Sequence, residues 1–187
     1  MLAAATGSAD SVAEIQAKVT MGDAALAKIE EYNNGDGVTP GPLSIQNYLD
    51  AGISSITADN LAAVNNQVLG AATGEADSVP QINTLVNFAI MALAKIEAYN
   101  NGDGTTPPAL IIQDYVDAGV SGVNSDNLAA VNAQVLAASS GDTNSVSEIQ
   151  SKVAAADDAL AKIEAYNNGN GSVPAALVIA DYQGAGV

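Results

Sequence analysis

Hydrophobic residues recur at helical spacing along the first third of the chain, which predicts a long amphipathic helix. A capping box at Ser11 and Glu14 marks its expected start. Asn33-Asn34-Gly35 marks its expected end, because these residues readily adopt the left-handed C-terminal conformation. Such a helix has about 22 residues and a length of roughly 33 Å. The spaced hydrophobic positions are Val12, Ile15, Val19, Leu26 and Ile29.

The same pattern occurs three times, with an offset of 67 residues and no gaps. Residues 25–30, Ala-Leu-Ala-Lys-Ile-Glu, recur as residues 92–97 and again as residues 159–164. The six tyrosines occupy only two positions of the repeat. They are Tyr32, Tyr99 and Tyr166 at one position, and Tyr48, Tyr115 and Tyr182 at the other. A fixed period of this kind indicates a tandem repeat architecture.

Each period predicts three helices: the long one, a short one and one of medium length. The short helix is expected near 43–51 and ends at Gly52, while the third begins after Thr57 or Asn124, both good N-caps. The predicted fold is all-α, with units at 1–67, 68–134 and 135–187 forming an array of bundles or a helical stack. The last unit stops before its third helix, and we infer an excerpt from a longer array.

The repeated apolar positions of the long helix predict the core of each unit. They are Leu26, Ile29, Leu93, Ile96, Leu160 and Ile163. Tyr32 follows Ile29 by three positions and Tyr48 follows Ile45 by three, which favours packed rings with bonded hydroxyls over platforms for a sugar or peptide. A Tyr99→Phe or Tyr115→Phe change would then have a small effect on stability and would remove no binding partner.

Composition excludes several kinds of chemistry. The chain carries 21 acidic residues and five basic ones, all lysines, and it contains no His or Cys. Nucleophilic triads and the usual zinc, haem and iron–sulfur ligand sets are therefore excluded. A net charge of −16 disfavours binding to nucleic acid. The longest apolar stretch, near 88–94, is short for a bilayer, so we expect no membrane insertion. Because the common catalytic residue types are missing, we expect no enzyme activity either.

The loop after the long helix is the one segment that suggests a metal. Asn33-Asn34-Gly35-Asp36-Gly37 is similar to a calcium-binding loop, but Tyr32 and Leu43 then fall where carboxylate ligands are required. A helix-ending turn is the favoured interpretation, and no cofactor is expected. Calcium binding in another geometry, through Asp36 or Asp103, is the alternative.

Acidic pairs and one apolar segment complete the candidate features. The pairs Asp114/Asp117 and Asp157/Asp158 are expected on solvated surface rather than in a catalytic site. The long helix of the second period is more apolar than its counterparts. Its additional residues predict packing against a neighbouring repeat or a second chain, or a partner-binding patch. They are Leu85, Phe88, Ile90 and Met91.

Three stretches carry a resemblance to a known kind of repeat. They are residues 92–107, 115–120 and 127–132. They resemble the alanine-rich tandem repeats of very large adhesin-like, RTX-type surface or secreted proteins of marine Gram-negative bacteria. The resemblance covers essentially the whole chain and carries over no catalytic or ligand residue. It implies an extracellular or cell-surface location and a spacer or adhesion role.

The sequence thus favours a non-catalytic extension repeat of a large extracellular adhesin, in contact with neighbouring repeats of the same chain. The alternative is a multivalent module that binds a protein or glycan receptor, with or without a response to calcium. The repeated residues are mainly core, cap and loop positions, which favours the spacer. The truncated end exposes a face that predicts pairing with a second copy.

Overall fold

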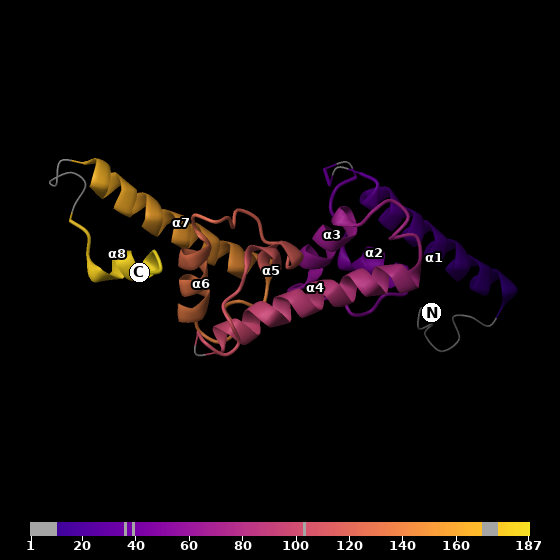
Figure 1. Cartoon of the computed structure of the whole chain (residues 1–187). Helices are drawn as coiled ribbons and strands as arrows, with labels where there is room; N and C mark the ends of the chain where they lie inside the picture. Colours follow the sequence, from indigo (N-terminus) through magenta and orange to yellow (C-terminus); the bar gives the residue numbers. More distant parts are fainter. Residues whose placement is uncertain (1–10, 36, 39, 103, 170–175) are drawn as a thin grey trace. The chain divides into compact units, whose positions relative to one another are not determined.

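The computed structural model describes residues 11–187 except 36, 39, 103 and 170–175. The described chain is all-α and contains no strand, which confirms the predicted class (Figure 1). Its helices are α1 (Val12–Asn33), α2 (Ile45–Asp50), α3 (Leu61–Gly70), α4 (Val79–Asn100), α5 (Ile112–Asp117), α6 (Leu128–Ala137), α7 (Val146–Asn168) and α8 (Ile179–Gly184). α1, α4 and α7 are the long helices of the three sequence periods.

The chain packs as two compact units, Met1–Ile90 and Met91–Val187. The boundary between them falls inside α4, so that one continuous helix contributes its first half to one unit and its second half to the other. The periods 1–67, 68–134 and 135–187 describe the sequence, whereas the boundary between the two compact units falls in the middle of α4.

The long helices begin where the capping boxes predict. The Ser11 hydroxyl accepts a hydrogen bond from the Glu14 N–H, and Ser145 does the same for Glu148. The predicted left-handed ending at 33–35 is wrong, because Asn34 is right-handed, with φ of −85°. The side chain of Asn33 is occupied instead in a contact with α3, described below.

The third helices begin later than expected. Thr57 accepts from the Asn60 N–H in a preceding turn, and the α-helix itself starts at Leu61. The equivalent turn at Asn124 precedes α6, which starts at Leu128.

The predicted core is confirmed only in part. Ile29, Leu93 and Ile96 are buried. Leu160 and Ile163 are only half-buried, and Leu26 is half-buried as well. The expectation for Ile163 was wrong because no third helix of the described chain covers the second half of α7, whereas the equivalent Ile29 and Ile96 are covered. Leu26 and Leu160 are half-buried alike, although α3 packs against α1, so this position lies at the edge of the core.

α4 is long and apolar enough to cross a membrane if only length and composition are considered. A helix that packs in a protein core can satisfy the same two criteria. α4 buries Ile82 and Val86 in its first half and Ile96 in its second. The length and composition of α4 are therefore weak evidence that it spans a membrane, and the absence of membrane insertion stays a prediction.

Candidate functional site

Each long helix has two apolar faces, one in each half. We call the first the leading face, which in α4 consists of Ile82, Val86 and Ala89. The second is the trailing face, which in α4 consists of Ile96, Tyr99 and Asn100. All six side chains are buried in α4. The leading face contacts the third helix of the preceding repeat and the trailing face contacts the third helix of the same repeat, and together they form the candidate functional site of the chain.

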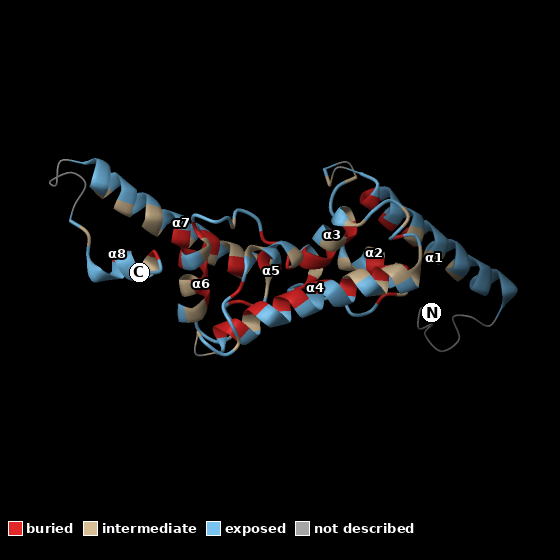
Figure 2. Ribbon diagram, in the orientation of Figure 1, coloured by how far each residue is buried: buried red, intermediate tan, exposed pale blue. Residues whose placement is uncertain are grey.

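The other long helices each bury only one face (Figure 2). The buried residues of α1 all lie in its second half, and those of α7 all lie in its first half. Ile15, in the leading face of α1, is 51% exposed, whereas the equivalent Ile149 of α7 is 0% exposed. Burial therefore follows the presence of a neighbouring third helix, since the residue type is the same.

In the second unit the leading face of α7 packs against α6. Val153 lies close to Gly122, in the turn before α6. Gln150 clamps the same turn, because its side chain accepts from the Ser121 N–H at 3.1 Å and donates to the Ser121 carbonyl at 2.9 Å. Farther along, the Asn127 amide donates to Asp157 at 2.7 Å. A carboxylate expected to be solvated thus takes part in the contact between repeats.

Two polar positions beside the leading face are the same in α1 and α7 and differ in α4. Gln16 and Asp23 of α1 stand where α7 has Gln150 and Asp157. At the same positions α4 has Asn83 and Ile90. The replacement of the carboxylate by Ile90 makes this position of α4 apolar.

The trailing face is tied to the third helix by a side-chain amide. The Nδ2 of Asn33 donates to the carbonyls of Val68 and Ala71, at 2.8 and 2.9 Å. Asn100 makes the same pair of bonds, to Val135 and Ala138, at 2.8 Å each. These carbonyls end α3 and α6, so one amide satisfies groups that a helix leaves unpaired at its C-terminus.

A buried tyrosine and asparagine connect the short helix to the third helix. The Tyr115 hydroxyl donates to Asn132 Oδ1 at 2.7 Å, and Asn132 Nδ2 donates to the Leu110 carbonyl at 2.9 Å. Tyr48 and Asn65 repeat the arrangement in the first unit. Burial raises the pKa of Tyr48 and of Tyr115 well above the ordinary value. The hydroxyls of these two tyrosines are bonded and their rings packed, as the spacing predicts, whereas Tyr166 is half-buried and Tyr182 is exposed.

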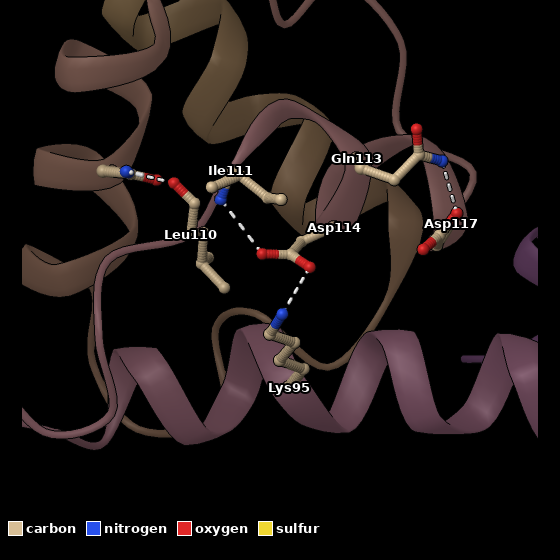
Figure 3. Close-up of polar contacts among 7 residues, drawn as sticks. Lys95, Leu110, Ile111, Gln113, Asp114 and Asp117 are labelled. Atoms are coloured by element: carbon tan, nitrogen blue, oxygen red, sulfur yellow. Dashed lines mark hydrogen bonds and ion pairs between the residues drawn. The ribbon is translucent and has the colours of Figure 1, made fainter.

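An ion pair holds the short helix against the long one (Figure 3). Lys95 on α4 donates to Asp114 on α5 at 2.5 Å. The other carboxylate oxygen of Asp114 accepts from the Ile111 N–H at 3.0 Å and caps α5. Asp114 was expected on solvated surface, and this was wrong: the side chain is buried because it serves two partners at once. Its neighbour Asp117 accepts from Gln113 on the exposed side.

The equivalent pair in the last repeat gives a pH-dependent prediction. The Lys162 ammonium, followed by the Val178 N–H, holds the pKa of Asp181 below its ordinary value. A lowered carboxyl pKa contributes stability above the ordinary value of 3.8, and this contribution is lost as the pH falls through the folded-state pKa. We expect α8 amides to lose hydrogen-exchange protection in acid. Asp181→Asn should remove this pH dependence, and equal acid sensitivity in that variant would contradict the assignment.

The suggested metal ligands Asp36 and Asp103 lie outside the described residues. Within the described part of the chain, no group of three or more acidic side chains is placed to hold a metal ion. Gly37 and Gly104 have positive φ, and an added Cβ would approach Leu69 and Leu136 at 2.6 and 2.8 Å. Close packing against the third helix therefore explains the second glycine of the first two loops.

The apolar patch of α4 lies mainly on exposed surface. Phe88 is 55% exposed, and Ile90 and Met91 are exposed as well, while Leu85 is half-buried. At the position of Phe88, α1 has Met21 and α7 has Ala155. The patch thus belongs to one repeat, and its role in binding a partner stays a prediction.

Comparison with family models, curated proteins and solved structures found no match to this chain. The site is therefore defined by its own geometry. Sequence analysis missed the amides of Asn33, Asn100, Asn65 and Asn132. Each belongs to a position that recurs with the 67-residue period and follows a repeated apolar residue, Tyr32 and Tyr99 or Val64 and Val131. A polar residue kept at such a position indicates a buried hydrogen bond.

Proposed function

We propose that this chain is a non-catalytic structural segment, in which tandem repeats act as an extension spacer of a large extracellular adhesin. The observation that carries the proposal is the division of α4 between two compact units. A helix shared in this way allows one repeat to be added after another with the same contacts. The adhesin context comes from the resemblance of the repeat sequence.

The polar chemistry supports a structural role. The bonded groups at the interfaces connect elements of the chain to each other: Asn100 to α6, Gln150 to the turn before α6, and Lys95 to α5. The buried carboxylates Asp114 and Asp181 each serve a lysine and a helix cap. Asn100, Lys95 and the two carboxylates thus hold single repeats together, and Gln150 holds one repeat to the preceding one, a nearest-neighbour contact of the kind expected in repeat proteins.

The multivalent binding module is less well supported. Such a module gains avidity from the same exposed side chains presented repeatedly. The exposed apolar residues of α4 are not repeated, because α1 has Ala24 and α7 has Asp158 at the position of Met91. The positions that do recur are those of the interfaces, caps and loops.

The spacer proposal predicts that length grows in proportion to repeat number. Chains with one, two and three added 67-residue periods should each increase the maximum dimension in small-angle scattering by the same amount. This follows because every added repeat makes the same contacts with its neighbour. Measurements with calcium and with a chelator should agree. An increment that shrinks with each added period would contradict the spacer, and elongation only with calcium would assign the loop to a metal.

A further inference from the structure

Each long helix ends beside an asparagine that is followed by a glycine. These asparagines are Asn34, Asn101 and Asn168, and all three side chains are exposed. In α1 and α4 the preceding residues, Asn33 and Asn100, are also asparagines, but their side chains are buried and donate to the third helix. One amide of each pair therefore has a structural role, whereas the other is accessible to water.

An exposed asparagine before a glycine can lose its side-chain amide without an enzyme. The glycine nitrogen gives its proton to a base in solution and attacks the asparagine Cγ. A bond forms between that nitrogen and Cγ, the bond from Cγ to Nδ2 breaks, and Nδ2 leaves as ammonia. Water then opens the cyclic imide at one of its two carbonyls and produces aspartate or isoaspartate, with no oxidation or reduction. Glycine favours ring closure because it has no side chain to obstruct it.

The folded helix end restrains the first of these steps. The Gly35 N–H donates to the Tyr32 carbonyl at 3.1 Å, and the Gly102 N–H donates to the Tyr99 carbonyl at 3.1 Å. A glycine nitrogen must release this bond before a base in solution can take its proton. The reaction therefore proceeds from a frayed helix end, and fraying of this kind is among the local openings of lowest free energy.

The buried amide beside each exposed one limits fraying in α1 and α4. Asn100 Nδ2 donates to the carbonyls of Val135 and Ala138, and these bonds join the end of α4 to the end of α6. Asn33 makes the equivalent bonds to the end of α3. Since Asn101 directly follows Asn100, the end of α4 should open more often when the two bonds are absent.

We propose that Asn34, Asn101 and Asn168 are sites of spontaneous deamidation. The buried amides of Asn33 and Asn100 slow the reaction in α1 and α4, because they hold the helix end in its hydrogen-bonded form. The reaction consumes only water and releases ammonia, so it needs no enzyme or partner. It concerns the chemical ageing of the chain and is independent of the proposed function as a spacer.

The product changes the electrostatics of the helix end. Each conversion adds a negative charge at the C-terminus of a long helix, where the helix dipole is itself negative. The last turns of α1, α4 and α7 contain no basic residue that would offset this charge. Asn101→Asp, which copies one product, should raise the hydrogen-exchange rates of the last turn of α4 about twofold to fivefold.

The test is incubation of the full chain in mildly alkaline buffer, followed over time by mass spectrometry. Each conversion raises the mass by about one dalton. Cleavage after lysine places the three sites in different fragments, residues 29–95, 96–152 and 163–187. Fragmentation within each peptide assigns the change to one residue and separates Asn168 from Asn170, which also precedes a glycine but lies outside the described residues.

The expected result is conversion at the three exposed sites, with Asn33 and Asn100 unchanged. Asn87 is the matched control, because its side chain is exposed as well but is followed by Phe88. It should stay intact while the three sites react. Conversion at Asn87 as fast as at the proposed sites would overturn the inference. So would a folded chain that stays unmodified after a sample unfolded in guanidinium chloride has reacted completely.

The role of the buried amide is tested by comparing rates. Unfolding in guanidinium chloride should accelerate conversion at Asn34 and Asn101 at least about fivefold, because the helix end is then always open. Asn100→Ala should accelerate conversion at Asn101 about threefold to tenfold, a change typical of lost hydrogen bonds, and leave Asn34 in the other compact unit unaffected. Circular dichroism checks that this variant is folded, and the guanidinium comparison needs no variant. Equal rates in the folded and unfolded chain would show that the helix end does not restrain the reaction.

Discussion

Replacing Ile96 by alanine should destabilise the second unit by about 2–5 kcal/mol, the usual cost of removing a fully buried isoleucine. The Ile96 side chain is completely buried in the trailing face of α4. The free energy of unfolding can be measured by urea denaturation followed by circular dichroism at the helical band. The loss arises from lost contacts and from the cavity that remains, because the surrounding helices relax only in part.

The chain supplies its own matched control for this substitution. Residues 92–101 and 159–168 have the same sequence, and both segments lie in the second unit and contain the end of a long helix. Ile163→Ala makes the same change in the same local sequence, but at a half-exposed position. We expect a loss of at most about 1 kcal/mol there, in keeping with partial burial. Equal losses at the two positions would refute the assignment of the trailing face as an interface with the third helix.

The second large effect is expected at Asn132. Asn132→Ala should cost about 3 kcal/mol, because it leaves two buried groups, the Tyr115 hydroxyl and the Leu110 carbonyl, without partners. Tyr115→Phe removes the hydroxyl and keeps the ring, so its cost should be near 1 kcal/mol. Urea denaturation again provides the comparison between the variants.

Two further variants test the origin of this effect. Asn101→Ala removes an exposed amide at the end of α4 and should change the free energy of unfolding by less than about 0.5 kcal/mol. The double variant with Tyr115→Phe and Asn132→Ala should cost less than the sum of the single changes, because the hydroxyl left unpaired by one is removed by the other. Additive losses would show that the hydroxyl and the amide do not interact.

The helices could be predicted because their determinants are local. The spacing of apolar residues and the capping boxes at Ser11 and Ser145 lie within one or two turns of the sequence that they organise. The third helices were placed less well, because the turns at Thr57 and Asn124 carry cap-like side chains ahead of the first helical residue.

Burial could not be predicted from the same patterns. Ile96 and Ile163 have identical neighbours in sequence and differ in exposure, because one is covered by α6 and the other is not. Asp114 illustrates a related limit. Its burial depends on Lys95, which lies 19 positions earlier and reaches it only when α5 packs against α4. Such contacts form only when separate helices pack together, so the spacing of residues within one helix does not predict them.

The boundary between the compact units and the 67-residue period of the sequence affect how the number of repeats in the gene can change. The boundary between the two compact units falls in the middle of α4, whereas the repeated sequence keeps the same 67-residue spacing without gaps along the chain. Unequal crossing-over between copies can therefore join them at any codon, and a gain or loss of 67 codons rebuilds a complete helix at the join. A gene for such a repeat can change its copy number without passing through a broken fold, and a population can carry alleles of many lengths.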